Sequence, residues 1–537
     1  MAKIRFEKFG VMIDLSRNSV MTVDALCRFM DAIAKMGYNC IFLYTEDTYE
    51  IEGEPYFGYL RGRYTKEEMK ALDAYGKEKG IEVIPCIQTL AHLATFTRWQ
   101  TVKNDVPGIL LVEDERTYEL IDRMFATLAE CFTTRRLHVG MDEAHLLGKG
   151  QYLHLHGYED THAIIARHLE RVTEIAKKYG FSLMLWSDMF FRPWNKGHYY
   201  SPKCTMPKEY VEALPEGVIP VYWDYYRTRL EDYDDMMYNH RQLSPDFWFA
   251  GGAWTWTGYM PHNDFTLQTM LPALQAAKKN RTRNVFFTMW GDDGGECSRF
   301  AVLPSLFYLS EVARGNKDEE KIKAKFKRLF GVSYDDFMLL DALDHVVGSG
   351  EEARSTCNPS KYMLISDTFL GFLDPTVERN AAHRFDALAE QLSAVAKKSR
   401  RYRPLFDEAA KLSSLLAVKY DLGVRVRDAY KAGDKDALLK LAKEDYPLAI
   451  RRLDAFLASV EHAWLSENKR FGLDVQHIRI GAVRARLEYC RKTLLSYLKD
   501  EIDQIPELEE DILPWRTEDK STVYNGTLSN LTVGSIW

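Results

Sequence analysis

Two adjacent carboxylic acids, Asp142 and Glu143, close the segment Arg136-Leu-His-Val-Gly-Met-Asp-Glu-Ala144. Successive side chains of a strand point to opposite faces, so neighbouring acids cannot both face the axis of a regular strand. We expect Asp142 at the strand end and Glu143 on the first loop residue, where both approach one substrate from different angles. Gly140 would let the backbone pass close by.

Further charged, histidine and aromatic residues stand at the ends of the predicted strands. These candidates are Asp14, Arg17, Glu46, Asp47, His92, His145, Trp186, Asp188, Trp223, Asp224, Tyr225, Trp254, Trp256, Trp290, Asp292, Asp293 and Glu296. Acids hydrogen-bond hydroxyl groups, and aromatic faces stack on the C–H faces of a sugar ring. The combination predicts a carbohydrate site.

Each candidate also has a purely structural interpretation. An acid at a strand end, such as Asp47 or Asp188, is often the N-cap of the next helix. A single tryptophan there usually packs in the core, and His92 alone would more often be a buried barrel histidine than a catalytic group. Five tryptophans on four consecutive strand ends favour the binding interpretation.

Eight strand–helix repeats between residue 10 and about residue 315 must position these side chains. The predicted strands are Val11–Ser16, Cys40–Tyr44, Ile81–Gln88, Arg136–Asp142, Ser182–Ser187, Ile219–Trp223, Phe247–Ala253 and Val285–Trp290. The alternation predicts a closed (β/α)8 TIM barrel, whose active site lies at the C-terminal ends of the strands. A doubly wound sheet is the alternative, but the turn after the first strand has no glycine-rich nucleotide loop.

A second domain follows the barrel. We expect the catalytic barrel at residues 1–315 and an α-helical domain at residues 316–537. Its helix candidates are Arg379–Lys398, Pro404–Leu422, Asp436–Glu461 and Val475–Lys499. We expect this domain to mediate homodimer formation or to contribute a loop to the cleft.

Composition excludes several classes of protein. The 537 residues are 46% hydrophobic, with no apolar run of about 18 residues that would span a membrane. The net charge of −7 is spread along the chain, so no basic stripe offers itself to nucleic acid. Eight scattered cysteines, without CxxC spacing or a signal peptide, predict reduced thiols in a cytoplasmic protein. We expect neither a cofactor nor a metal.

The segment Val139-Gly-Met-Asp-Glu143 resembles the signature of glycoside hydrolase family 20, the β-N-acetylhexosaminidases. Further matches in chain order are Val11–Arg17, Ile84-Pro with His92, Trp186, Trp223 and Trp290-Gly-Asp292. The resemblance covers most of residues 10–315. A barrel followed directly by a helical domain is similar to a bacterial subset that lacks the usual N-terminal α/β domain.

The resemblance implies an exo-acting enzyme that removes terminal β-linked N-acetylglucosamine or N-acetylgalactosamine from a glycan. Catalysis would be retaining and substrate-assisted, with Glu143 as general acid and then base, and with Asp142 stabilising the acetamido group. The tryptophans would enclose that group. A protonated Glu143 would need a poorly solvated pocket and a nearby negative charge.

The sequence departs from the family pattern at three places. Phe9-Gly10 stands where an Arg-Gly commonly provides the arginine that binds the 3- and 4-hydroxyls, and Arg17 or the eighth-strand acids are the candidate replacements. Met141 replaces the usual glycine before Asp-Glu. Tyr225 is the candidate for the tyrosine that orients the acetamido group, and Arg17, Glu46 and Asp292 are candidates for sugar selectivity.

Two other functions remain open. His92, His145, Asp142 and Glu143 could bind Zn²⁺ or Mn²⁺ in a metal-dependent hydrolase or isomerase, although no HxH or HExxH motif is present. A non-catalytic sugar-binding barrel is the other alternative, and the intact Asp-Glu pair argues against it.

Overall fold

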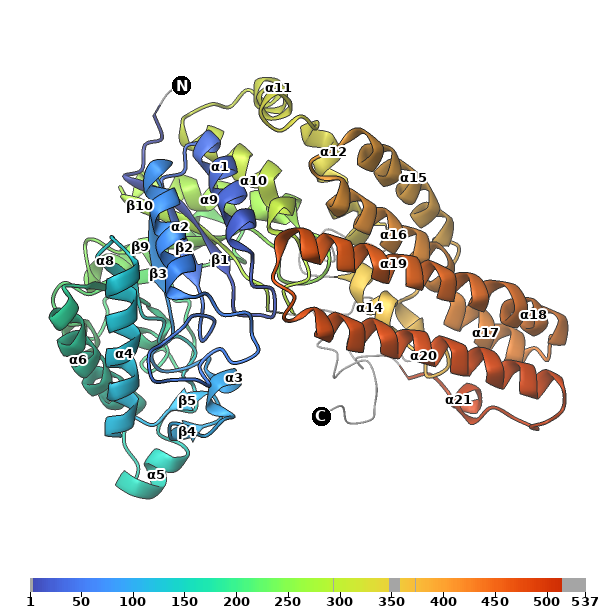
Figure 1. Cartoon of the computed structure of the whole chain (residues 1–537), viewed down its shortest axis with the longest axis horizontal. Coiled ribbons are helices and arrows are strands. Elements are labelled where there is room, and N and C mark those ends of the chain that lie inside the picture. Colours follow the sequence, from blue (N-terminus) through green and yellow to red (C-terminus); the bar gives the residue numbers. More distant parts are fainter. Residues whose placement is uncertain (1–2, 293, 347–357, 372, 514–537) are drawn as a thin grey trace. The chain divides into compact units, whose positions relative to one another are not determined.

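The predicted barrel is confirmed. The computed structural model describes residues 3–292, 294–346, 358–371 and 373–513. In this part of the chain eight parallel strands close on one another, with helices packed outside them (Figure 1). Around the barrel they are β1 (Lys8–Asp14), β10 (Asn284–Met289), β9 (Trp248–Gly252), β8 (Ile219–Trp223), β7 (Ser182–Trp186), β6 (Arg136–His138), β3 (Glu82–Cys86) and β2 (Cys40–Tyr44).

Local sequence signals explain the helices that alternate with these strands. Helix α2 (Lys66–Glu78) begins with a capping box between Thr65 and Glu68, and α1 (Val23–Met36) ends at Gly37, whose φ of 86° is left-handed. The other helices of the outer ring are α4 (Glu115–Cys131), α6 (Thr161–Tyr179), α8 (Leu230–Leu243), α9 (Asn263–Lys279) and α10 (Leu303–Ala313).

The loop after β3 contains elements that the sequence did not indicate. It holds the short helix α3 (Ala94–Thr97) and a two-stranded antiparallel hairpin of β4 (Asn104–Val106) and β5 (Ile109–Leu110). Because active-site loops of a barrel leave the C-terminal ends of its strands, this insertion belongs to the functional face.

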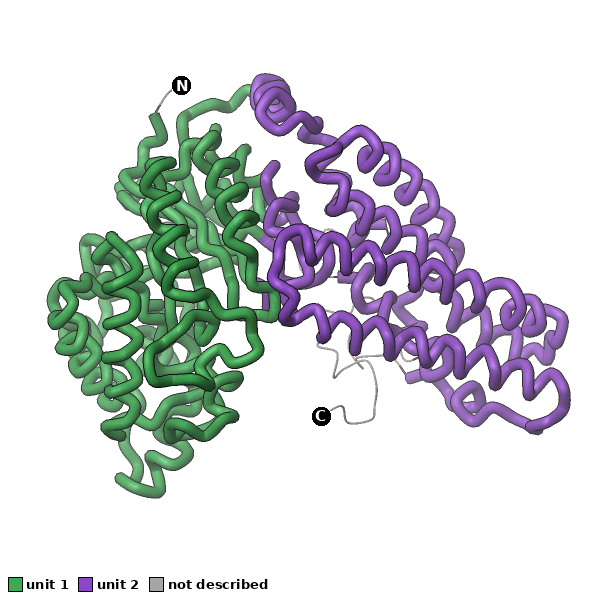
Figure 2. The backbone as a smooth tube through the Cα atoms, viewed as in Figure 1, with its two compact units in different colours: residues 1–253, 266–290, 305–318 green, residues 254–265, 291–304, 319–537 purple. Residues whose placement is uncertain are grey.

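The chain divides into two compact units, coloured separately in Figure 2. Unit 1 comprises residues 1–253, 266–290 and 305–318, and it contains all eight barrel strands. Unit 2 comprises residues 254–265, 291–304 and 319–537. The loops after β9 and β10 therefore belong to unit 2, a detail that a single boundary near residue 315 does not capture.

Unit 2 is helical in its described part, as predicted. Its longer helices are α11 (Glu319–Phe330), α15 (Ala382–Lys398), α16 (Arg403–Lys419), α17 (Leu422–Lys431), α19 (Tyr446–Glu467) and α20 (Leu473–Leu498). The predicted helix Asp436–Glu461 is interrupted, because α18 (Lys435–Lys440) runs into a π-helical turn at Leu441–Asp445 before α19 begins. Pro447 lacks a backbone N–H, which accounts for the widened turn ahead of it.

No helix in the described ranges combines the length and apolar character that a membrane span requires. The seven described cysteines are all free thiols, and Cys357 lies outside the described residues.

Candidate active site

The Asp142–Glu143 pair lies on a tightly turned loop rather than on a strand. The predicted strand Arg136–Asp142 was too long, because β6 ends at His138. The backbone then takes positive φ at Gly140 (73°), Met141 (71°) and Glu143 (52°). Turning the chain in this way lets adjacent carboxylates serve one site, as expected. Met141 adopts a left-handed conformation that glycine adopts more readily.

Gln88, just beyond β3, holds this loop in place. Its Nε2 donates to Oδ1 of Asp142 (2.7 Å), and its Oε1 accepts from the backbone N–H of Met141 (3.1 Å). A Cβ on Gly140 would lie 2.2 Å from the Gln88 Oε1, so only glycine leaves room for this amide. Gln88 therefore fixes the orientation of Asp142.

His92, on the same loop as Gln88, is the counter-charge of the pair. Its Nε2 lies 3.2 Å from Oδ2 of Asp142 and 3.8 Å from Oε2 of Glu143. Burial alone would lower the pKa of His92, but the Asp142 carboxylate outweighs burial and raises it from 6.5 to about 9. For Asp142, burial would raise the pKa, but His92 and the Gln88 hydrogen bond bring it below its ordinary value. An imidazolium therefore faces a carboxylate at neutral pH.

This pairing predicts a pH dependence of stability. Because the pKa of His92 is raised in the folded protein, its contribution is complete below pH 6.5 and is lost as pH rises through about 9. We expect the thermal unfolding midpoint to fall between pH 7 and pH 9.5 more steeply in the wild type than in His92→Gln, as measured by calorimetry. Replacement of the exposed His154 serves as the control, and parallel wild-type and His92→Gln curves would contradict the assignment.

Glu143 is more open to solvent than Asp142. Its side chain is 45% exposed, compared with 13% for Asp142. Within the described part of unit 1, Glu143 therefore does not lie in the poorly solvated pocket that was expected around it. Asp142, adjacent in the chain, is the negative charge that was expected beside Glu143. The backbone N–H of Glu143 also donates to Oδ2 of buried Asp188 (3.1 Å).

Asp188 supports this loop instead of capping a helix. The same Oδ2 lies 3.3 Å from Nε of Arg192, and Oδ1 has no hydrogen-bond partner among the described residues. Burial, followed by the charge of Asp142, raises the pKa of Asp188 from 3.8 to about 7. Asp188 is therefore a buried acid whose pKa the charge of Asp142 helps to raise, and it accepts a hydrogen bond from the backbone of Glu143.

The ends of β1 and β2 contribute a second charged group to the same mouth. Arg17 lies 3.4 Å from Oε1 of Glu46, which also accepts from the hydroxyl of Tyr44 (3.1 Å). Burial raises the pKa of Glu46 from 4.5 to about 7 against the lowering effect of Arg17. Asp47 instead anchors loops, through Arg61 (3.0 Å) and Thr95 (3.3 Å).

Four predicted aromatic residues gather on the other side of the barrel mouth. Trp186 and Trp290 have ring centroids 5.9 Å apart, and Trp223 stacks on Tyr225 at 5.5 Å. Tyr225 hydrogen-bonds with the side chains of Trp290 and Thr288. Ends of β7, β8 and β10 thus form one aromatic wall. The structure brings together Arg17, Glu46, His92, Asp142, Glu143, Trp186, Trp223, Tyr225 and Trp290 in unit 1.

The remaining predicted residues belong to unit 2. Trp254 and Trp256 are buried and stack on each other at 4.1 Å, and Asp292 is exposed. Asp293 lies outside the described residues. Glu296 is not a free acid for sugar, because its carboxylate oxygens lie 2.6 Å from Lys361 and 2.6 Å from Arg479.

Backbone strain marks the site independently of side-chain type. Twelve described non-glycine residues have positive φ, and Glu46, His92, Met141 and Glu143 are four of them. Such conformations cost about 1–3 kcal/mol each and persist where the surroundings impose them, often at functional sites. Their concentration on three neighbouring strand ends supports the location of the site.

Sequence reasoning missed Gln88 and Tyr44. Gln88 is the last residue of the predicted third strand, so its position at a strand end could have identified it. It was missed because only charged, histidine and aromatic residues were candidates. Tyr44 is buried at the end of β2 and looks like core from its sequence context. Its hydroxyl connects Gln88 (3.0 Å) to Glu46.

The geometry gives no support to the metal-dependent alternative. Across the described ranges, no three His, Cys, Asp or Glu side chains gather in a manner suited to a metal ion.

Two family models match the chain. "Glycosyl hydrolase family 20, catalytic domain" matches residues 6–207, and "Glycoside Hydrolase 20C C-terminal domain" matches residues 335–526. The first match contains the Asp142–Glu143 loop, Gln88 and His92.

Individual proteins are also similar to parts of this chain. Human Hexosaminidase D is 24% identical over 360 residues, which are 61% of this chain and 70% of that protein. The beta-hexosaminidase of Emericella nidulans is 27% identical over 166 residues, which cover 25% of this chain and 27% of the relative. Among solved structures, the GH20 beta-N-acetylhexosaminidase of Streptomyces coelicolor A3(2) has a TM-score of 0.44 and 18% identity, covering 61% of this chain and 70% of its own.

Proposed function

The chain belongs to glycoside hydrolase family 20 and is a β-N-acetylhexosaminidase, and we propose that Glu143 and Asp142 carry its catalysis. The substrate is a glycan with a terminal β-linked N-acetylhexosamine, which is removed as a single sugar. The observation that carries the assignment of roles is the unequal environment of two adjacent carboxylates that share the His92 nitrogen.

Asp142 is suited to remain ionised. It is buried, it accepts from Gln88 and it faces His92, and together these partners lower its pKa. A fixed negative charge of this kind can accept the acetamido N–H and stabilise the positive charge that develops on that group. Glu143, half exposed, is accessible to a glycosidic oxygen and to water.

Neither neighbouring acid is placed to act as an enzyme nucleophile. Glu46 is buried beside Arg17 and Tyr44, and Asp188 is buried beneath the Glu143 backbone. Membership of family 20, whose enzymes work by substrate assistance, assigns the role of nucleophile to the acetamido oxygen of the substrate, which is held next to the anomeric carbon within one molecule. The aromatic wall of Trp186, Trp223, Tyr225 and Trp290 would enclose that group.

The reaction proceeds in two steps. Glu143 gives its proton to the glycosidic oxygen while the acetamido oxygen bonds to the anomeric carbon, and the aglycone leaves as an alcohol. Water then attacks the anomeric carbon, Glu143 takes a proton from that water, and the acetamido group is restored. Both substitutions invert the anomeric carbon, so its configuration is retained overall.

Release of p-nitrophenol from two substrates tests the proposal. We expect rapid hydrolysis of the β-N-acetylglucosaminide, none of the plain β-glucoside, and no effect of a chelator, because catalysis depends on the acetamido group. Equal turnover of both substrates would require a nucleophile on the enzyme and would contradict the role of Asp142. Chelator sensitivity would favour the metal-dependent alternative, and inactivity on both would favour the binding-protein alternative.

A further inference from the structure

Three exposed aromatic side chains cluster on the loops that follow β2 and β3. Tyr56, Tyr59 and Trp99 are 44%, 44% and 40% exposed. The Trp99 ring lies 5.4 Å from that of Tyr56 and 5.6 Å from that of Tyr59, and the two tyrosine rings are 6.0 Å apart. We propose that this aromatic platform binds pyranose rings of the glycan on the aglycone side of the cleaved bond. The inference rests on the proposed function and extends it to a second binding site.

The hydrophobic core does not need these three rings. Phe57, between the two tyrosines, is buried and contacts the rings of Tyr49 (5.1 Å) and Phe96 (4.9 Å). The Phe57–Phe96 contact joins the two loops from inside. Because the loops bury other aromatic residues to pack together, the exposure of the platform is not explained by packing.

Turned backbone presents the platform to solvent. Leu60, next to Tyr59, has φ of 58°, and Gln100, next to Trp99, has φ of 55°. Gly58 also has positive φ, and a Cβ there would meet the backbone oxygen of Asp47 at 2.3 Å. Left-handed conformations at Leu60 and Gln100, beside Tyr59 and Trp99, are energetically costly. The surrounding structure therefore imposes the backbone conformation that exposes these rings.

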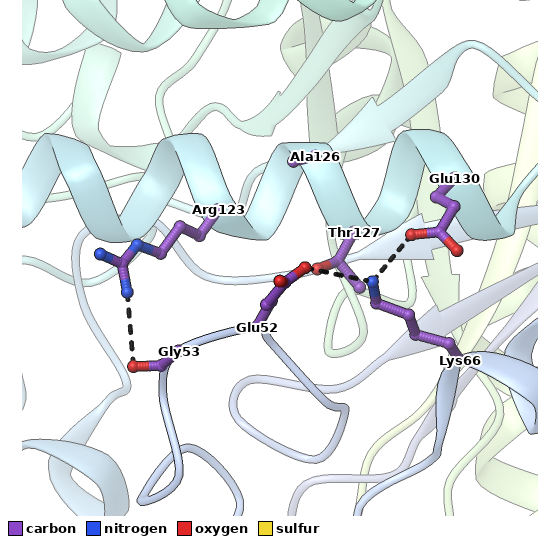
Figure 3. A pocket seen from close by; sticks show the side chains of 7 residues that line it. All are labelled: Glu52, Gly53, Lys66, Arg123, Ala126, Thr127 and Glu130. Carbon is purple, nitrogen blue, oxygen red and sulfur yellow. Dashed lines mark hydrogen bonds and ion pairs between the residues drawn. The ribbon is translucent and has the colours of Figure 1, made fainter.

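Contacts with Arg123 of α4 hold the β2–α2 loop, which carries the two tyrosines. Figure 3 shows a surface groove where Arg123 donates to the Gly53 oxygen (3.3 Å) and Lys66 pairs with Glu130 (2.8 Å). Glu52 completes this groove at 3.7 Å from Lys66. Lys66 pairs with both carboxylates of the groove, and Arg123 pairs with Glu54 of the loop (3.3 Å), so these contacts attach the loop to α4. An anchored loop loses little conformational entropy when a sugar stacks on it.

The platform also shares its loops with the active site. Glu46 begins the loop that carries Tyr56 and Tyr59, and His92 precedes Trp99 by seven residues. Seven residues span at most about 25 Å, a distance that a short oligosaccharide covers. Thr95 and Arg61 both bind Asp47, which ties the two loops together at the barrel mouth. An exo-acting enzyme encloses only the terminal sugar, so any ring that reaches the platform belongs to the aglycone.

Kinetics of Trp99→Ala test the platform, because Trp99 contacts both tyrosines. The substrates are p-nitrophenyl β-N-acetylglucosaminide and N-acetylglucosamine trisaccharides with β-1,3 or β-1,4 bonds. We expect kcat/KM to fall about tenfold for at least one trisaccharide, as for the loss of one stacking contact. For the aryl glycoside it should stay within about twofold, because that substrate has no second sugar ring for the platform to bind. Trp99→Phe should retain most of the trisaccharide activity. Tyr238→Ala, which removes an exposed tyrosine of α8, should leave kcat/KM unchanged for both kinds of substrate.

A binding measurement separates failure of the platform from failure of the proposed function. Calorimetric titration of the same trisaccharides into Glu143→Gln, with and without Trp99→Ala, should show about tenfold weaker binding in the double variant even if turnover is never observed. Unchanged trisaccharide kinetics and binding in both Trp99→Ala and the triple alanine variant of Tyr56, Tyr59 and Trp99 would overturn the proposal. A change of oligomeric state in those variants, with sugar kinetics unaltered, would overturn it in favour of contact between two copies of the chain.

Discussion

Replacement of Glu143 by glutamine should lower kcat for sugar leaving groups by about two to four decades, the usual contribution of general acid–base catalysis. Glutamine keeps the shape of the side chain but cannot give or take the proton. The loss should be smaller for p-nitrophenyl than for a sugar aglycone, because p-nitrophenolate needs less protonation as it leaves. Steady-state kinetics on both leaving groups measure this difference.

Two controls separate this effect from a structural one. Glu143 is half exposed, so its replacement should leave the unfolding free energy within about 0.5 kcal/mol of the wild type. Azide, an anion that attacks without a general base, should restore turnover of the p-nitrophenyl substrate as the glycosyl azide. Near-normal turnover of both substrates would remove Glu143 from the mechanism. The control is Glu216→Gln, which replaces an exposed acid elsewhere in the chain, and an equal loss of activity in that variant would also contradict the assignment.

The barrel was readable because its signals are local. Strands β2 and β8 agree with the prediction to the residue, since each is a short apolar run that ends at a polar residue, Thr45 after β2 and Asp224 after β8. The Thr65 capping box and the glycine after α1 mark helix ends for reasons of backbone hydrogen bonding alone. The β4–β5 hairpin was missed because its two strands are only three and two residues long.

The conformation of the catalytic loop could not be predicted from the local sequence. The sequence placed both acids where the chain leaves the barrel strand, but the predicted strand was extended to Asp142 although β6 ends at His138. The cause is a contact with a residue far away in the sequence, because the Gln88 amide fills the space beside Gly140 and bonds to Met141. A strand pattern cannot reveal an amide that arrives from another loop.

Pairings of distant residues account for the other differences. Glu296 resembles a sugar-binding acid until Arg479, almost two hundred residues later, is seen to neutralise it. Trp254 and Trp256 belong to unit 2, and their role at the site stays a prediction. Strand-end position therefore identified candidates, and only tertiary contacts could show that Glu296 is paired with Lys361 and Arg479.

Asp142→Asn should lower kcat by about two to three decades with a much smaller change in KM. The lost charge matters most when the acetamido group becomes positive in the transition state, and fixed electrostatic partners contribute on this scale. Asparagine can still accept the Gln88 hydrogen bond, so the loop should keep its conformation. Kinetics on p-nitrophenyl β-N-acetylglucosaminide measure the change.

Gln88→Met gives the matched comparison, because it removes the orienting amide but keeps the Asp142 charge. We expect a smaller loss, about tenfold. We also expect the acid limb of kcat/KM to move to higher pH, because the Gln88 hydrogen bond helps to lower the pKa of Asp142. A structural role for Gln88 alone would change the unfolding midpoint without moving that limb. If Asp142→Asn turned over the substrate like the wild type, the acetamido group would need no charged partner and substrate-assisted catalysis through Asp142 would be wrong. A large loss in Asp142→Asn with a modest, pH-shifted loss in Gln88→Met would instead assign the charge to Asp142 and its orientation to Gln88.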